Sequence, residues 1–457
     1  MAKKDAKAST RPSKPSKQPN PVWRMMGLPN FHFRLPSRNW MIFLTITGSW
    51  TAAVLYDRRE KKRIQRKWTK LVEHIAQEPL DTHQLPRKLS VYMSAPPADG
   101  LVPARNHFHE YVKPILVVAA LDWDAVEGRK EGDVQAGLAE RIRRFRRKMG
   151  EQASKAPESD LEEVLEESRR RAGVLGPEGT AGDIVIGRHA WKEYVRGLHE
   201  GWLGPLDPPE QLDATQASAL IDASSISAQD ASPPPSIASP ADDASPTAIH
   251  ENPASQELEK SKEEENKHKM KKQPLPYNST ADYSISTLSP NCPSELPPAA
   301  VIPLPHLLGF LNFPIRMYRF LNRRKVADEI GRQTAAAVLA AYRPFDGPGE
   351  LRLDLELENA KVLDDEHGPR WEQERLLRHE ESEWHKSVLE HKDGYEKERV
   401  WMDDMVLDSR IAGRMRKFEL SPEAEDQANK VAIEKEEPWW KSIWPNTEKK
   451  KEAWEDL

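Results

Sequence analysis

The chain has 457 residues, of which 38% are hydrophobic and 31% charged, and its mean hydropathy is −0.75. It contains 38 prolines against 22 glycines, and its one cysteine, Cys292, excludes an intrachain disulfide, a CxxC redox site and a cysteine-based zinc site. Residues 1–70 carry 17 Lys/Arg and 3 Asp/Glu, while the other 387 residues carry 51 and 70, so the net charge of −5 divides into +14 and −19.

The first 38 residues form a basic, proline-rich tail. They contain nine Lys/Arg and one acid, Asp5, a composition typical of a mitochondrial transit peptide. Two interpretations stay open, a disordered basic tail and an uncleaved address to the mitochondrial inner membrane. The amphipathic helix of a cleavable presequence is prevented by six prolines: Pro12, Pro15, Pro19, Pro21, Pro29 and Pro36.

Residues 39–56 (NWMIFLTITGSWTAAVLY) contain no charge, at the short end of the roughly 17–25 residues that span a bilayer. Trp40 and Tyr56 stand at the ends, and a basic run begins after Asp57. The pattern predicts a single transmembrane helix. A buried core helix and a cleaved signal are the alternatives, disfavoured by the charge boundary and by the lack of a cleavage site. The positive-inside rule alone would place the C-terminal side in the matrix, because residues 57–75 carry eight Lys/Arg and 20–38 only three.

Beyond this segment we expect an α+β or α/β soluble region. Residues 57–85 predict a basic juxtamembrane helix with an apolar stripe of Ile64, Trp68, Leu71, Val72 and Ile75. Residues 86–204 alternate between strand-like and helix-like segments, which predicts an α/β subdomain with a small mixed or parallel sheet and flanking helices. The expected strands cover 89–93, 115–121 and 184–186, and the expected helices 104–112, 133–149 and 189–199.

Residues 205–300 predict a long disordered linker, since 17 of the 38 prolines lie between Pro205 and Pro305. Residues 301–457 then predict a helix-rich C-terminal subdomain. Its apolar start, over 301–325, either packs against the first subdomain or lies in a membrane interface. The other expected elements are helices over 327–342 and 371–395, a half-exposed strand over 351–357, and three tryptophans that close the core or dock elsewhere: Trp439, Trp440 and Trp444.

No histidine pattern predicts a metal site. His379 and His385 are six residues apart, about 120° around a helix, whereas a zincin needs two histidines four apart on one face. His107 and His109 flank Phe108 without a further ligand in register. We therefore predict no metal ligand, no cofactor and no catalytic residue.

One segment resembles an enzyme. Residues 184–190 (IVIGRHA), followed by Glu193 and Leu198, are distantly similar to the strand–turn–helix of diacylglycerol-type lipid kinases, where a glycine-rich turn and an aspartate cradle nucleotide phosphates. Here the turn has one glycine and no acid, so a degenerate or divergent membrane-anchored lipid kinase is kept only as the alternative function.

A second charged feature covers residues 141–148, which carry six Arg/Lys. Acidic residues surround it and no aromatic platform interleaves the arginines, so nucleic-acid binding is not expected. The pattern predicts a solvated face, or a docking face for an acidic partner or a lipid headgroup.

Four blocks together resemble one family, the fungal form of the fifty-four-kilodalton subunit of the carrier translocase of the mitochondrial inner membrane. None of the blocks is a catalytic signature, and the resemblance rests on their order along the chain together with their residue composition. The blocks are Asn20 to Tyr56; Lys88 to Tyr92; Leu307 to Phe310, running on to Arg332; and Trp384 to Ser387, through Arg410 to Ala412, to Arg414–Leu420.

The resemblance implies a non-catalytic subunit of the machine that inserts multi-spanning carrier proteins. It implies an inner-membrane location with the large domain in the intermembrane space, opposite to the charge rule. The implied partners are channel-forming and other membrane subunits, small intermembrane-space chaperone complexes and inner-membrane lipids. A scaffold for an inner-membrane AAA protease is a further implied role.

Overall fold

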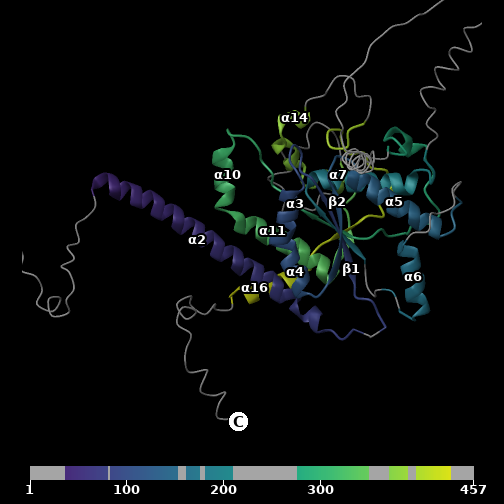
Figure 1. Ribbon diagram of the computed structural model, residues 1–457, viewed down its shortest axis with the longest axis horizontal. Coiled ribbons are helices and arrows are strands. Elements are labelled where there is room, and N and C mark those ends of the chain that lie inside the picture. Colours follow the sequence, from purple (N-terminus) through teal and green to yellow (C-terminus); the bar gives the residue numbers. More distant parts are fainter. Residues whose placement is uncertain are drawn as a thin grey trace, which may run out of the picture. The chain divides into compact units, whose positions relative to one another are not determined.

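The computed structural model (Figure 1) describes residues 37–80, 83–152, 161–174, 176, 181–208, 275–348, 370–389 and 398–433. The chain divides into two units, Met1–Tyr56 and Asp57–Leu457. Four predictions lie wholly or mostly outside the described residues: the tail over 1–38, the centre of the 205–300 linker, the strand over 351–357 and the C-terminal tryptophans.

In the first unit the structure describes the start of helix α2, Arg38–Val72. Its apolar side chains are exposed, among them Trp40, Phe43 and Leu44. The predicted transmembrane helix over 39–56 is not supported, because no helix in the described part of the chain is both long and apolar enough to cross a membrane. The helix forms, but glycine and hydroxyl residues dilute its hydrophobicity, and Thr47 donates its hydroxyl back to the Phe43 carbonyl at 2.8 Å.

The second unit is built on one mixed, six-stranded sheet with the order β2-β1-β3-β4-β6-β5. All neighbours are parallel except the edge strand β5, which runs antiparallel to β6. The mixed sheet with flanking helices confirms that part of the expected fold class. The strands are β1 Lys88–Ser94, β2 Asp122–Gly128, β3 Gly182–Ile186, β4 Ala299–Ile302, β5 Tyr342–Pro344 and β6 Arg416–Phe418.

Helices cover both faces of this sheet (Figure 1). Alternation along β1 sends Leu89, Val91 and Met93 to one face and Tyr92 to the other. The first face packs against residues 57–72 of α2 and against α3 Val102–His107, a π-helical turn Phe108–Val112, α4 Lys113–Val118, α11 Arg323–Leu339 and α16 Pro422–Ile433. The second packs against α5 Asp133–Lys148 and α7 Arg188–Leu203, with α6 Leu161–Arg171 between them in sequence.

Several predicted elements are confirmed. The strands over 89–93 and 184–186 are β1 and β3, and the helices over 133–149, 189–199 and 327–342 are α5, α7 and α11 within a few residues. The helix over 104–112 corresponds to α3 and the π-helical turn. The apolar stripe of the basic helix also faces the core: Trp68, Leu71 and Val72 are buried, and Ile64 and Ile75 pack against the same cluster.

The predicted strand over 115–121 is wrong, since this run forms α4. Pro114 occupies the first turn, where its fixed φ favours a helix, and Ile115 and Leu116 are buried while Val117 is exposed. A short apolar run cannot be assigned to strand or helix by periodicity alone.

The separation into an α/β subdomain and a helix-rich C-terminal part also differs from the structure. Three strands of the single sheet, β4, β5 and β6, come from beyond residue 298. The helix predicted over 371–395 is broken in its described part, because Leu377 adopts a left-handed φ of 56° between α13 Glu372–Arg375 and a 3₁₀ helix, Arg378–Glu383. A short helix, α14 Lys386–Leu389, follows.

The predicted linker over 205–300 extends too far at both ends. Leu206 is buried at one end, and Tyr283 and Leu296 are buried at the other, with a 3₁₀ turn at Ala281–Ser284. Within residues 275–300, the prolines stand in an irregular segment that packs, through Tyr283 and Leu296, in the same cluster as α7. Residues 209–274 lie outside the described part.

Candidate functional site

The connections from β1 and from β3 leave the sheet in opposite directions, so the crevice between these strands is a topological switch point. Open α/β sheets bind ligands there, beyond the carboxyl ends of the strands. Ser94 ends β1, and Gly187 follows β3 and precedes the first residue of α7, Arg188. The turn with the kinase-like sequence therefore occupies the position where a phosphate site would form.

This turn is closed by a carboxylate of the chain itself. Glu380 accepts hydrogen bonds from the main-chain N–H of Arg188 at 2.9 Å and of Leu304 at 2.7 Å. Gly187 has a φ of +88°, and a Cβ there would lie 2.6 Å from Cε1 of His189. The donor that a helix N-terminus would offer a phosphate is thus already bound to Glu380.

A second buried carboxylate fills the space behind the turn. Glu193 accepts from the Trp401 Nε1–H at 2.6 Å, the Ser94 hydroxyl at 3.1 Å and the Val134 N–H at 3.0 Å. His189 donates Nε2–H to the Ser94 carbonyl at 2.9 Å. Burial raises the pKa values of Glu193 and Glu380 to about 7 each and lowers the pKa of His189 to about 4.

Helix α7 is buried along its whole length although half of its residues are polar. Its long side chains hold later segments of the chain: Trp191 Nε1–H donates to the Gln373 carbonyl at 2.9 Å, and Lys192 Nζ to the Trp401 carbonyl at 2.6 Å. His199 donates Nδ1–H to its own helix and accepts the Asp408 N–H at Nε2, at 2.9 Å. These side chains therefore hold residues 373, 401 and 408 against α7.

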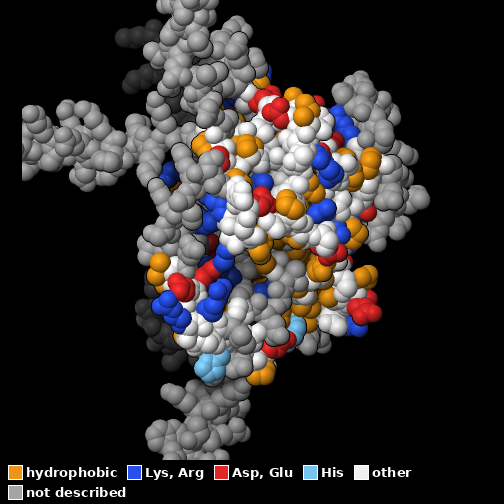
Figure 2. All heavy atoms as spheres, turned by 90° about the vertical axis from the view of Figure 1, so that its right-hand side faces the viewer, with side chains coloured by type: hydrophobic (Ala, Val, Ile, Leu, Met, Phe, Trp, Pro, Cys, Tyr) orange, Lys and Arg blue, Asp and Glu red, His pale blue; other side chains and the backbone are white. Residues whose placement is uncertain are grey.

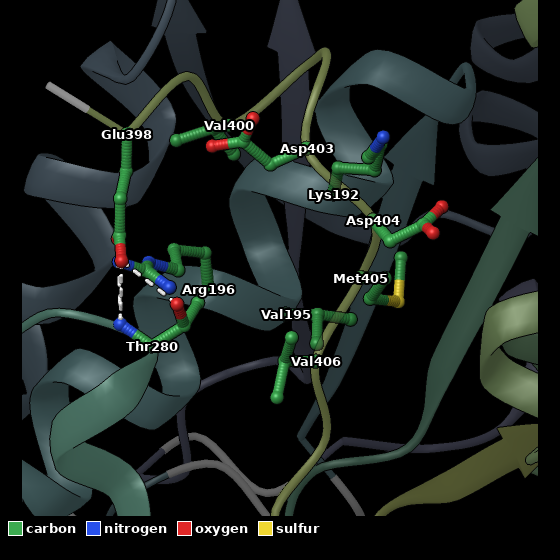
Figure 3. Close-up of a pocket in the computed structure, with 10 residues that line it drawn as sticks. All are labelled: Lys192, Val195, Arg196, Thr280, Glu398, Val400, Asp403, Asp404, Met405 and Val406. Carbon is green, nitrogen blue, oxygen red and sulfur yellow. Dashed lines mark hydrogen bonds and ion pairs between the residues drawn. The ribbon is translucent and has the colours of Figure 1, made fainter. Parts of the chain in front are cut away.

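A small pocket lies between α7 and the segment 398–406 (Figure 3). Its volume is about 30 Å³, an order of magnitude below the roughly 300–1,000 Å³ of ordinary ligand sites. At one end Arg196 forms an ion pair with Glu398, which also accepts the Thr280 hydroxyl at 2.7 Å (Figure 3). The pocket has room for ordered water and not for a nucleotide.

Residues 141–148 are only in part the solvated face that their spacing predicts, since Arg141, Arg144 and Lys148 are exposed while Arg143 and Arg146 are buried. Arg143 is buried in an ion pair with Glu200 and lies over the Tyr277 ring at 3.6 Å. Arg146 donates to the carbonyls of Gly201 and Gly204 at 2.7 and 2.8 Å. On the face shown in Figure 2, basic, acidic and hydrophobic side chains are interspersed.

Arg141 is exposed and takes part in a further group of polar contacts, with β1. It donates to the Ser90 hydroxyl at 2.9 Å, and nearby the Tyr194 hydroxyl donates to Asp183 at 2.7 Å. Burial raises the pKa of Asp183 to about 6. Arg141, Arg143 and Arg146 therefore connect α5 to its neighbours, while Arg144 and Lys148 stay exposed.

The histidines singled out in the sequence are not brought together. His379 and His385 are both exposed; His379 lies within the 3₁₀ helix Arg378–Glu383, and His385 lies two residues beyond its end. His107 contacts the Pro303 carbonyl at 2.9 Å, while His109 is exposed. No group of three metal-binding side chains occurs among the residues that the structure describes.

The buried groups predict opposite pH responses for two variants. Glu193 holds its proton more tightly when folded, so its stabilising contribution is lost as pH rises from about 4.5 to about 7. We expect the penalty of Glu193→Gln to be about 2 kcal/mol smaller at pH 8 than at pH 5.5. Burial lowers the pKa of His199 to about 4, so its contribution is lost as pH falls below about 6.5.

For His199→Asn the penalty should therefore be about 1 kcal/mol larger at pH 8 than at pH 5.5. Urea unfolding of the full chain at both pH values measures the two penalties, and each variant is the other's control. Penalties that move in the same direction would contradict the assigned protonation states.

Sequence reasoning found Gly187, His189 and Glu193 but missed Glu380 and Trp401, their main partners. Glu380 stands 192 residues after Arg188, and Trp401 208 residues after Glu193. No local pattern signals such a pairing. The only hint was compositional, since a helix as polar as α7 beside a buried strand needs partners for its charges.

The fold and the site define a doubly wound α/β domain whose switch-point edge is occupied by its own carboxylates. A family model described as "Inner membrane protein import complex subunit Tim54" matches residues 20–418, most of the chain. The chain belongs to this family, which confirms the resemblance found in the sequence.

Fungal relatives align over nearly the whole chain. The mitochondrial import inner membrane translocase subunit tim54 of Aspergillus oryzae is 46% identical over 434 residues, covering 91% of this chain and 94% of the relative. The Aspergillus fumigatus protein of the same name is 47% identical, covering 87% and 90%. That of Neurospora crassa is 44% identical, covering 92% and 84%.

Proposed function

We propose that this protein is a non-catalytic subunit of the mitochondrial inner-membrane translocase that inserts multi-spanning carrier proteins. Membership of the import-subunit family supports the assignment of the protein to an import complex and to the mitochondrial inner membrane. The observation that carries the non-catalytic role is the occupation of the switch-point edge by Glu380 and Glu193, which leaves the Arg188 N–H no capacity for a phosphate. The same observation argues against the lipid-kinase alternative.

Within the complex, the protein contacts channel-forming and other membrane subunits and supports docking of small intermembrane-space chaperone complexes. Residues 57–457 face the intermembrane space, where those chaperones deliver carriers. Protease added to mitochondria with ruptured outer membranes should then digest this unit, and its protection behind an intact inner membrane would reverse the orientation.

The exposed apolar helix over residues 38–56 supplies the contact with the membrane. Trp40, Phe43 and Leu44 are each about half exposed, and such a surface is unfavourable in water. Cationic residues placed in it would oppose transfer into an apolar phase by about 2.5–3.5 kcal/mol each at a bilayer centre, and by less nearer the surface.

The test is co-purification from mitochondria with a tagged full-length chain. Wild type should bring down membrane subunits of the carrier translocase, and Leu44→Arg with Thr47→Arg should lose them together with carrier import. Val164→Arg with Leu165→Arg is the matched control, because these residues are exposed apolar positions on α6 of the folded unit. His379→Ala with His385→Ala should also retain both readouts.

Other results would replace the proposal. ATP bound by the purified chain would revive the kinase alternative, and an AAA protease recovered in place of translocase subunits would favour the protease scaffold. Loss of import in the His379/His385 variant at normal protein level and assembly would demand a chemical role.

A further inference from the structure

The segment from Leu307 to Lys325 leaves several large apolar side chains uncovered in the folded unit. Phe310 and Leu311 are 91% and 92% exposed, and Phe313, Ile315 and Tyr318 are each at least half exposed. They occupy a turn and the helix that follows it, α10 Phe313–Phe320, at the periphery of the unit in Figure 1. Two adjacent large apolar side chains with nine-tenths of their surface in water are unfavourable unless something covers them.

The local structure holds this tip in place. Gly309 has a φ of +104°, and Asn312 closes the turn by donating Nδ2–H to the Leu308 carbonyl at 2.7 Å. Arg319 donates to Glu383 at 2.6 Å, which ties α10 to the 3₁₀ helix at Arg378–Glu383. The exposure of Phe310 and Leu311 is therefore built into a fixed turn.

The charge of the segment indicates what covers it. Residues 307–325 contain five Arg/Lys and no acid, in a chain whose residues beyond 70 carry a net charge of −19. Arg316, Arg323 and Lys325 are exposed beside the apolar residues, and Arg323 also lies 3.6 Å from the half-exposed Glu110. Aromatic and aliphatic side chains rimmed by cations are typical of a helix that lies in the headgroup region of an anionic bilayer.

The position of the segment in the folded unit agrees. Asp57, the first residue of this unit, is buried and accepts the Arg324 N–H at 3.3 Å, just after α10. Residue 57 lies within α2 and directly follows the apolar segment 38–56 to which we assign membrane contact, so chain connectivity keeps it near that contact. In this respect the inference rests on the proposed function.

We propose that the tip formed by residues 307–325 is a second membrane contact, inserting Phe310 and Leu311 at the surface of an anionic bilayer while Arg316, Arg323 and Lys325 meet lipid headgroups. The two interpretations of the 301–325 segment are thereby combined. Its first residues, Val301 and Ile302, belong to β4 of the sheet, and residues 307–325 face lipid.

The experiment uses the full-length chain with Cys292→Ser, reconstituted with phosphatidylcholine vesicles with and without phosphatidylglycerol. Single cysteines are introduced as Phe310→Cys, Ile285→Cys or Phe43→Cys and carry an environment-sensitive fluorophore. Ile285 is the matched control, an apolar residue of the folded unit that is 83% exposed but lies outside the cationic segment. Brominated lipid serves as the quencher.

The label at 310 should shift to shorter wavelength and be quenched by brominated lipid, more strongly with phosphatidylglycerol, while the label at 285 changes little. Arg316→Glu with Arg323→Glu should reduce the quenching at 310 several-fold. Quenching at 43 without quenching at 310 would overturn this inference and leave the proposed function standing. No quenching at either position would remove the membrane contact at 38–56 as well.

Discussion

Replacing Trp68 by alanine is expected to lower the free energy of unfolding by about 3–5 kcal/mol, the usual cost of removing a large buried aromatic side chain. Trp68 is 1% exposed and donates Nε1–H to Asp328 at 2.9 Å, so the substitution opens a cavity and also leaves a carboxylate without that donor. Its ring lies against Gly331 of α11, where a Cβ would come within 2.1 Å of Cδ1. The loss should therefore detach residues 57–72 from α11.

Urea unfolding of the full-length chain measures this effect. Trp40→Ala is the matched control, since it removes the same side chain from a position that is 58% exposed, and it should change the free energy of unfolding by no more than about 0.5 kcal/mol. Equal losses of unfolding free energy for the two variants would show that Trp68 does not hold residues 57–72 of α2 against α11.

Glu200→Gln should be nearly as costly, at about 3–5 kcal/mol, because it removes the buried counter-charge of the Arg143 guanidinium and leaves only the more exposed Glu140, at 3.8 Å. The two side chains are 2% and 3% exposed, and Glu200 also accepts Gln135 Nε2–H at 2.7 Å and the Tyr277 N–H at 3.0 Å. Glutamine keeps the shape and one acceptor, so the loss reports mainly the missing charge.

Arg143→Met in the Glu200→Gln background should recover much of this loss, since it removes the stranded cation while keeping apolar volume. Glu167→Gln is the control for an exposed pair, as Glu167 and Arg171 are 59% and 78% exposed, and it should have almost no effect on unfolding. If the double variant is no more stable than Glu200→Gln alone, an unpaired charge is not the cause.

The parts of the fold that the sequence predicts are those with a local signal. The spacing of Val134, Leu138 and Ile142 identifies α5, and the β-branched run at Ile184 identifies β3. By contrast, β2 reads as a polar segment, and β5 and β6 have three residues each, too few for a periodicity. Their place in the sheet depends on pairing with strands that are distant in the sequence, and a local pattern does not reveal such pairing.

The same reason limits the prediction of the site. A polar residue on a helix looks solvated when its partner lies far away in the chain, as for Arg143 with Glu200 or Lys192 with the Trp401 carbonyl. The sequence could indicate that the turn after β3 lacks the glycines and the aspartate of a phosphate site. It could not reveal that Glu380 stands in that place.

The strand order also bears on how the chain reaches its native state. Strands β1 to β3 and helix α7 are complete by residue 203, but β4 begins at residue 299 and β6 ends at residue 418. The central strand β3 therefore lacks its β4 neighbour until residues 299–302 have been made, and Arg188 and Glu193 of α7 lack their partners Glu380 and Trp401 until later still. A fold with such a high contact order is expected to form slowly, through an intermediate that exposes apolar surface and is prone to aggregate. We therefore expect the newly made chain to depend on chaperones until its last strand is in place.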